Sequence, residues 1–274
     1  MSDLYTVIGN PIAHSKSPLM HNAAFKALRI DAVYSATKVT DDELQSFTEK
    51  AKEELKGFNV TVPHKNTVMQ FLDEISKESI AAGSVNTVTV KDGRLIGDTT
   101  DGYGLQSALK EAFDVDVKGG RFLFLGAGGT VKAVTARFLS QGAEGIYIMN
   151  RTVSKAEDIA DNLKKYFPGK DIRFGSIEDH SLLAELMEDV EVVIQATSLG
   201  LKESDPSPIS ADLMNPNVCM FDTIYKKTPF LKNAEKTGCR YAGGIGMLLH
   251  QGARSFEIWT GKKPDIEIMR KALS

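Results

Sequence analysis

The sequence predicts an α/β protein of two domains, and three observations support this. Short apolar runs alternate with amphipathic helical patterns along most of the chain. Its 274 residues are enough for two hydrophobic cores. A hairpin signal in the first part indicates a mixed sheet, whereas strands and helices alternate in the next part, as in a parallel sheet. We expect one domain at 1–103, completed by C-terminal helices at 241–274, and the other at 104–240.

The first domain opens with a strand at 4–9 and a helix at 18–28. Ser17 directly precedes Pro18, as in an N-cap followed by proline at the first helical position. A plain helix cap is therefore one interpretation of Ser17. The other is that Ser15 and Ser17 bind a small carboxylate, because hydroxyls beside a helix N-terminus suit an anion.

A second strand is expected at 32–39, and a helix with an acidic first turn at 41–55. In the next strand Asn59 and Thr61 alternate with apolar residues, so their side chains share one face. Lys65 lies just past this strand, where open α/β sheets bind their ligands. A lone lysine is usually a solvated surface charge, but the polar strand face before it favours a site.

Two strands within 84–98 are joined by Asp-Gly at 92–93, a strong signal for a type I′ hairpin. Asn86 opens the first arm, and Asp101 follows the second at the start of a helix. Asp101 is either a helix-start residue or the partner of Lys65, and the sequence leaves both open.

The second domain is organised around 121–152, which is expected to form strand, glycine turn, helix and strand. Gly126 and Gly128 leave the backbone bare, so that a pyrophosphate can reach the amides at the next helix N-terminus. Gly129 extends that bare surface, while Val131 occupies the third position, which is usually small. An ordinary tight turn is the alternative, but the flanking elements favour a dinucleotide site.

The end of the second strand of that unit indicates which nucleotide binds. An NAD site places a carboxylate about 20 residues after the glycines to bind the ribose 2′-hydroxyl. Asn150, Arg151 and Thr152 stand there instead, and Lys155 adds a second cation. A guanidinium pairs with a 2′-phosphate that a carboxylate would repel. We therefore expect NADP(H), with a solvated surface Arg151 as the alternative.

The rest of the chain continues the alternation of strands and helices. A buried strand is expected at 190–197. The segment at its end, Thr197, Ser198, Leu199 and Gly200, should face the cofactor. A helix at 243–261 carries Gln251, a polar residue within an apolar pattern. Gln251 is either a hydrogen-bonded core amide or a substrate ligand, and the pattern favours neither.

Composition argues against several classes of protein. The net charge of −3 provides no electrostatic footprint for nucleic acid or an anionic membrane, and the apolar runs are too short to span a bilayer. The first residues lack a signal-peptide pattern, and Cys219 and Cys239 lack zinc-site spacing. We expect a cytoplasmic monomer or homodimer that acts on a small molecule without metal, nucleic-acid or membrane partners.

Taken together, the motifs resemble the shikimate dehydrogenase family over nearly the whole chain. They stand in the family's order and spacing: IGNPIAHSKSP, FNVTVPHK, GSVNTV, TDGYG, LGAGG, NRT, ATSLG and MLLHQGA with FEIWTG. The sequence departs from the family pattern at Gln195 and Thr99, where the family usually has Asn, and in a shortened segment after Tyr225.

The resemblance implies a mixed-sheet substrate domain and a Rossmann-type NADP-binding domain. It also implies reversible NADPH-dependent reduction of 3-dehydroshikimate to shikimate in chorismate and aromatic amino-acid biosynthesis, with Lys65 and Asp101 as the catalytic pair. The substrate-binding residues it implies are Ser15, Ser17, Asn59, Thr61, Lys65, Asn86, Asp101, Tyr225 and Gln251. The implied cofactor-binding residues are Gly126, Ala127, Gly128, Gly129, Thr130, Asn150, Arg151, Thr152, Lys155, Thr197, Ser198, Gly244 and Met247.

Three alternatives remain at this point. The first is an enzyme of the same class that prefers quinate or NAD, which Arg151 and the paired serines disfavour. The second is a regulatory protein that binds shikimate without turnover, against which the presence of both Lys65 and Asp101 argues. The third is a metal-dependent hydrolase, for which the sequence offers no ligand cluster.

Overall fold

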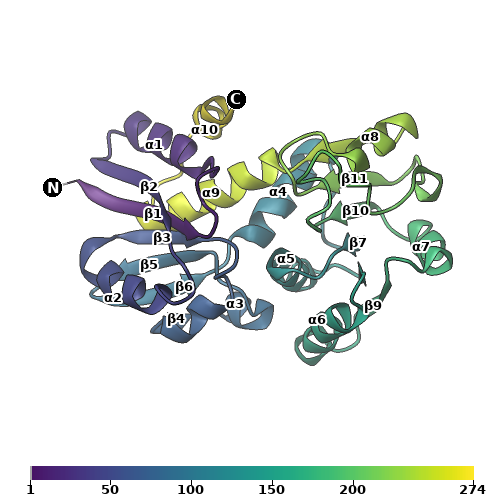
Figure 1. The fold of residues 1–274 in the computed structure, drawn as a ribbon, viewed down its shortest axis with the longest axis horizontal. Helices are drawn as coiled ribbons and strands as arrows, with labels where there is room; N and C mark the ends of the chain where they lie inside the picture. Colours follow the sequence, from purple (N-terminus) through teal and green to yellow (C-terminus); the bar gives the residue numbers. More distant parts are fainter. Residues whose placement is uncertain (1) are drawn as a thin grey trace. The chain divides into compact units, whose positions relative to one another are not determined.

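The computed structural model describes residues 2–274, which divide into two compact units. Unit 1 comprises the residues up to Gly104 together with Leu248–Ser274, and unit 2 comprises Leu105–Met247. Each contains a six-stranded sheet with helices (Figure 1). Residues 241–247, which we expected in the first domain, belong to unit 2, because Tyr241–Gly243 pairs with Cys219–Asp222 in its sheet.

The sheet of unit 1 is mixed, as the sequence predicts. Its strands are β1 (Asp3–Gly9), β2 (Ala32–Lys38), β3 (Gly57–Val60), β4 (Glu74–Ile75), β5 (Thr87–Lys91) and β6 (Arg94–Asp98). They lie in the order β2-β1-β3-β5-β6-β4. β1 is parallel to β2 and β3, whereas β5 is antiparallel to both of its neighbours.

The turn between β5 and β6 matches the predicted hairpin. Asp92 and Gly93 have φ of 52° and 72°, and a type I′ turn requires positive φ at both central residues. The register places Thr87 opposite Asp98. The hairpin therefore brings the residue before β5 close to the residues that follow β6, which include Asp101.

The helices of unit 1 include two that the sequence pattern did not single out. Within residues 2–274, all the helices of unit 1 are α1 (Ser17–Ala27), α2 (Leu44–Glu54), a 3₁₀ helix (Thr67–Phe71), α3 (Lys77–Ala82), α10 (Ile266–Leu273), the start of α4 (Asp101–Phe113) and most of α9 (Ile245–Thr260). The short α3 and the 3₁₀ helix were not predicted, because six or fewer residues display too little helical periodicity.

The predicted N-cap role of Ser17 is wrong. Lys16 occupies the N-cap position without a side-chain cap, and Ser17 is the first helical residue. The Ser15 hydroxyl accepts a hydrogen bond from the Ser17 N–H at 3.3 Å. Ser15 therefore supports the start of α1 through the Ser17 N–H, whereas Ser17 as an N-cap would have accepted from an N–H two or three residues later.

Helix α2 also begins later than predicted. The N–H and the hydroxyl of Thr40 both donate to the Glu43 carboxylate, at 2.9 and 2.7 Å. This arrangement holds residues 41–43 in a turn, so the helix starts at Leu44 and its first turn has no acidic residue.

The sheet of unit 2 has Rossmann-type topology, as predicted. Its strands are β7 (Arg121–Leu125), β8 (Gly145–Asn150), β9 (Asp171–Ser176), β10 (Val192–Gln195), β11 (Cys219–Asp222) and β12 (Tyr241–Gly243). All pairs are parallel, in the order β9-β8-β7-β10-β11-β12. Strand order reverses between β7 and β10, the point at which such sheets bind nucleotides.

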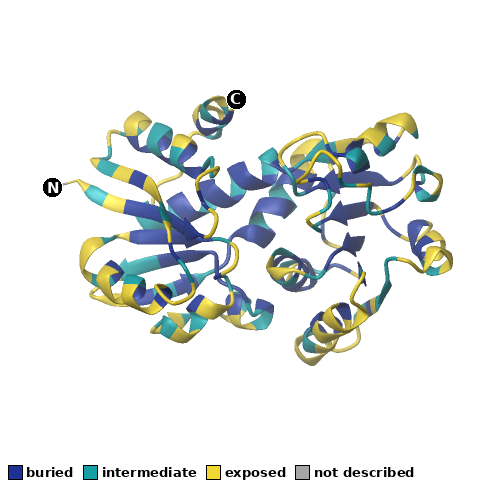
Figure 2. Ribbon diagram, in the orientation of Figure 1, coloured by how far each residue is buried: buried dark blue, intermediate teal, exposed yellow. Residues whose placement is uncertain are grey.

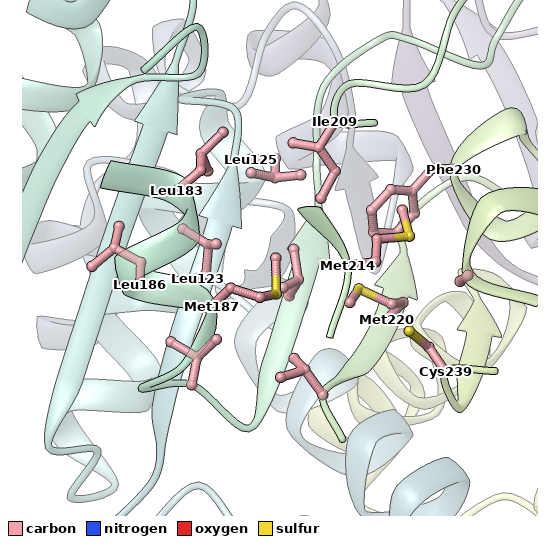
Figure 3. Packing of buried hydrophobic residues seen from close by; sticks show 14 of the residues in the cluster. Leu123, Leu125, Leu183, Leu186, Met187, Ile209, Met214, Met220, Phe230 and Cys239 are labelled. Atoms are coloured by element: carbon pink, nitrogen blue, oxygen red, sulfur yellow. The ribbon is translucent and has the colours of Figure 1, made fainter. Parts of the chain in front are cut away.

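Strand β7 is buried on both faces after Arg121, as the wholly apolar run at 122–125 predicts. The helices of unit 2 are α5 (Gly129–Ser140), α6 (Val153–Tyr166), α7 (His180–Met187) and α8 (Pro229–Lys236), with a 3₁₀ turn at Ala211–Leu213. On one face of β7, Phe122 and Phe124 pack edge-on against Phe138. On the other, Leu123 and Leu125 join the apolar cluster shown in Figure 3. Figure 2 shows the central strands of unit 2 as buried, with exposed residues on the outer helix surfaces.

Candidate active site

The loops that follow the strands of unit 2 enclose a cavity of about 520 Å³. It lies at the strand-order reversal, because residues that follow β7, β8, β9 and β10 line it. Nine of the predicted cofactor residues are among them: Gly126, Ala127, Gly128, Asn150, Arg151, Thr152, Lys155, Thr197 and Ser198.

The two glycines of the first turn meet different requirements. Gly126 has φ of 117°, and a Cβ there would lie 2.8 Å from the carbonyl oxygen of Ala196. Gly128 has an ordinary φ of −91°, and a Cβ there would meet no atom within 4 Å. Gly126 is therefore required by the fold, whereas Gly128 leaves open space at the N-terminus of α5, where N–H groups can bind a phosphate.

The end of β8 carries cationic side chains into the cavity. The Asn150 amide donates to the carbonyl oxygen of Thr152 at 2.9 Å and fixes the turn before α6. Arg151 and Lys155 are exposed and line the cavity. The acidic residue in the lining is Glu178, which follows β9 rather than β8.

Four predicted cofactor residues are not in the cavity lining. Gly129 and Thr130 begin α5, Gly244 lies between β12 and α9, and Met247 is 8% exposed within α9. Conversely, the prediction omitted several lining residues: Ile177, Glu178, His180, Ala196 and Pro208. Leu199, which was expected to face the cofactor, also lines the cavity. The loop after β9 could have been predicted, because the carboxyl ends of parallel strands meet at one edge of the sheet.

In unit 1 the predicted catalytic pair is in direct contact. Lys65 Nζ lies 2.5 Å from Asp101 Oδ2, and the two side chains are 14% and 6% exposed. Lys65 follows β3, and its carbonyl oxygen accepts from the Val85 N–H at 2.8 Å. Asp101 is the first residue of α4. Asp101 is therefore both a helix-start residue and the partner of Lys65.

Asn86 and Gln251 join the same group of side chains. Asn86 Nδ2 donates to Asp101 Oδ1 at 2.7 Å and lies 3.3 Å from Gln251 Oε1. Gln251 Nε2 donates to the Leu248 carbonyl oxygen at 2.9 Å within α9. The loop before β5, α4 and α9 thus bring three predicted residues together with Lys65.

Asn59 lies behind this group, and both its amide hydrogens are used within the protein. Its Nδ2 lies 2.9 to 3.1 Å from three acceptors, and its Oδ1 accepts from the Tyr34 hydroxyl at 2.7 Å. The three acceptors are the Asn86 carbonyl oxygen and the hydroxyls of Thr87 and Ser255. The oxygen of Asn59 is therefore the atom that remains able to contact a ligand.

A cluster of buried hydroxyls, which the sequence analysis missed, supports these amides. Thr87 and Thr100 lie 2.8 and 3.2 Å from the Ser255 hydroxyl. Ser255 lies one helical turn after Gln251 on α9, so the two share a face. This spacing is the signal from which Ser255 could have been predicted.

The remaining predicted substrate residues lie at the edges of elements. Ser15 is half-buried, Ser17 is buried at the start of α1, and Thr61 directly follows β3. Tyr225 belongs to unit 2, follows β11 and is 48% exposed.

Residues 2–274 contain no cluster of three or more His, Cys, Asp or Glu side chains arranged to bind a metal ion. Within the same residues, no helix is both long and apolar enough to cross a membrane.

Three sequence-family models match the chain in succession. Residues 7–88 match the shikimate dehydrogenase substrate binding domain, and 107–203 match shikimate / quinate 5-dehydrogenase. Residues 244–273 match the shikimate 5′-dehydrogenase C-terminal domain.

Full-length relatives carry similar names. The NADP(+) shikimate dehydrogenase of Thermococcus kodakarensis is 44% identical over 275 residues, which is 98% of this chain and 95% of the relative. That of Methanopyrus kandleri is 39% identical over 272 residues, 97% and 93% of the two chains.

Solved structures agree with these matches. Shikimate 5-dehydrogenase from Listeria monocytogenes, in complex with shikimate and NAD, superposes with a TM-score of 0.93 at 35% identity, over 100% of this chain and 96% of that one. The Thermus thermophilus enzyme, in complex with NADP(H) and shikimate, gives 0.88 at 32% identity, over 99% and 98%.

Proposed function

Because the chain belongs to the shikimate dehydrogenase family, we propose that it interconverts shikimate and 3-dehydroshikimate with NADP(H) as cofactor. One observation carries the proposal beyond family membership. The Lys65 ammonium and the Asp101 carboxylate are 2.5 Å apart in the unit that contains the match to the substrate-binding domain. Reduction of a ketone needs a proton donor beside the carbonyl oxygen, and a lysine held by a carboxylate is suited to that role.

The cavity of unit 2 fits the dinucleotide. The first N–H groups of α5 would hold the pyrophosphate, since Gly128 places no side chain over them. Arg151 and Lys155 would bind the 2′-phosphate, because no carboxylate stands at the end of β8 to repel it. When bound, NADPH supplies the hydride for reduction of the ketone.

The pair Lys65 and Asp101 handles the proton. Lys65 Nζ, as ammonium, protonates the carbonyl oxygen as the alcohol forms, and as amine it accepts the hydroxyl proton in the reverse direction. Asp101 holds Nζ through one carboxylate oxygen, and Asn86 donates to the other. Asn86 therefore fixes the plane of the carboxylate, and with it the position of the lysine.

The other polar groups would bind the substrate. Ser15, Ser17 and Tyr225 are assigned to the carboxylate, and Thr61, Asn86 and Gln251 to the ring hydroxyls. Asn59 would accept a hydrogen bond through Oδ1, since its hydrogens are used within the protein. We further propose that the enzyme serves chorismate and aromatic amino-acid biosynthesis as a cytoplasmic monomer or homodimer.

The test is an initial-rate assay that follows absorbance of the reduced nicotinamide, with shikimate or quinate and with NADP or NAD. We expect shikimate with NADP to have the highest kcat/KM. Lys65→Ala should lower kcat by about 10²- to 10⁴-fold while shikimate still binds. Preference for quinate or NAD would overturn the stated specificity, and shikimate binding without turnover in the wild type would indicate a regulatory protein.

A further inference from the structure

A fully buried amide lies beneath the wall of the cofactor cavity that follows β10. Gln195, the last residue of β10, is 0% exposed. Its Oε1 accepts from the Thr197 N–H at 2.5 Å, and its Nε2 donates to the Leu199 carbonyl oxygen at 2.9 Å. One side chain therefore fixes both ends of the three-residue turn, and all three of its residues line the cavity.

The amide is itself held from the neighbouring strand. Asp222 ends β11 and is 0% exposed, and its Oδ1 lies 3.4 Å from Gln195 Nε2. The same carboxylate accepts from the Ile224 N–H at 2.9 Å and from the Thr228 hydroxyl at 2.5 Å. Among the described residues no cation pairs with it, so these donors replace a counter-ion.

The network ends at a helix. Thr228 is the N-cap of α8, and its Oγ1 also accepts from the Leu231 N–H at 3.4 Å. A path of hydrogen bonds thus runs from α8 through Asp222 and Gln195 to the cavity wall. Burial raises the pKa of the Asp222 carboxyl group, because desolvation disfavours its charged form, while its hydrogen bonds from Thr228, Ile224 and Gln195 act in the opposite direction.

The position of the 197–199 turn within the sheet limits which part of a bound dinucleotide it can contact. In the strand order, β10 lies on one side of β7, whereas β8 and its cations lie on the other. The turn after β10 therefore faces a part of the dinucleotide away from the 2′-phosphate. That part is common to NADP and NAD.

We propose that Gln195, supported by Asp222 and Thr228, is a positioning residue that shapes the 197–199 wall for the part of the dinucleotide common to NADP and NAD. The inference rests on the proposed function, because it takes the cavity to be the NADP site. Gln195 acts through the backbone of Thr197 and Leu199 and not by contact with the ligand.

The principal variant is Gln195→Met, which keeps the length of the side chain but removes its hydrogen bonds. We expect the dissociation constant of NADPH, measured by titration of its fluorescence, to rise at least tenfold. The KM for NADP and the KM for NAD should rise by similar factors, while the KM for shikimate stays within twofold. Amide hydrogen exchange without cofactor should speed up at Thr197.

Thr228 tests the far end of the network. Thr228→Val keeps the shape of the residue but loses the hydroxyl, and we expect NADPH affinity to fall severalfold. Thr228→Ser keeps the hydroxyl and should restore affinity to within twofold of wild type. Equal losses in the Val and Ser variants would overturn the proposed path, because they would indicate packing against the methyl group.

A matched control separates positioning from general loss of stability. Tyr147→Phe also removes a hydroxyl that makes part-buried contacts, to Arg121, Asp171 and Asp189, but near the amino ends of strands of the same sheet. It should lower Tm without changing NADPH affinity. If Gln195→Met binds NADPH as tightly as wild type, the inference fails. If wild type itself does not bind NADPH, the proposed function fails instead.

Discussion

The two units form their candidate sites from different kinds of groups. In unit 1 the candidate substrate site consists of buried side chains that hydrogen-bond one another, such as Lys65, Asp101 and Asn86. In unit 2 the cavity is lined by backbone turns and by exposed cations such as Arg151. A substitution in the first site breaks a network, whereas in the second its effect depends on whether it changes the backbone or only a charge.

The same contrast determines how selectively each site binds its ligand. Buried amides that are already paired offer a ligand few free atoms, so a molecule with misplaced hydroxyls leaves polar groups without partners. An exposed guanidinium binds a phosphate in solvent and with fewer geometric demands. We therefore expect strict substrate recognition in unit 1 and a graded cofactor preference in unit 2.

The largest expected effect tests the network in unit 1. Asp101→Asn removes the charge that holds Lys65 and places an amide beside Asn86, which already donates there. We expect kcat to fall by about 10²- to 10⁴-fold in the shikimate assay.

The control for Asp101 is another ion pair. Asp114→Asn breaks a contact of 2.7 Å with Lys110, but the Asp114 side chain is 86% exposed. It should leave kcat unchanged, because exposed pairs contribute little. Unchanged kcat in Asp101→Asn would show that the ion pair does not serve the reaction.

The two regions also differ in how far the sequence predicted them. Elements of unit 2 follow simple rules: β7 is apolar after its first residue, and the glycine turn and α5 come directly after it. Those rules predicted the strand-reversal site and most of its lining residues. Glu178 and His180 were not predicted, because the loop after β9 carries no motif and only its place at the carboxyl edge of the sheet indicates them.

In unit 1 the sequence predicted several site residues that the structure brings together, Lys65, Asp101, Asn86 and Gln251, but not which hydrogen bonds their side chains make within the protein. A chain pattern cannot indicate that the hydrogens of Asn59 are taken by residues as distant as Ser255. The N-cap error at Ser17 has a similar cause, since the Ser15 hydroxyl accepts from the Ser17 N–H and the chain is already helical at Ser17. Side-chain competition of this kind is decided by three-dimensional packing, and local patterns do not record it.

The next effect separates backbone shape from open space in the cavity of unit 2. Gly126→Ala forces a Cβ against Ala196 at positive φ, and we expect it to lower the free energy of unfolding by about 1–3 kcal/mol and to weaken NADPH binding. Gly128→Ala has room and an ordinary φ, so Tm should not change. Its methyl group should still weaken NADPH binding, because it occupies space in front of α5.

Thermal melts and NADPH titrations on both glycine variants provide the measurement. Each serves as the control for the other, since both add one methyl group within the same turn. A drop in Tm for Gly128→Ala, or full NADPH affinity in that variant, would contradict the assignment of this space to the dinucleotide.

The smallest expected effect concerns the exposed cations. Arg151→Ala should raise the KM for NADP about tenfold, as expected for loss of one charge-assisted hydrogen bond of about 1.5–3 kcal/mol partly offset by Lys155. The KM for NAD should hardly change, so the ratio of the KM for NADP to the KM for NAD should rise. For Gln195→Met, in contrast, we expect both KM values to rise by similar factors. Added salt should reduce the NADP preference of wild type more than that of the variant, because exposed charges are screened. If Arg151→Ala weakened both cofactors equally, the guanidinium would be supporting the turn after β8 and not binding the 2′-phosphate, and the contrast between the two walls of the cavity would disappear.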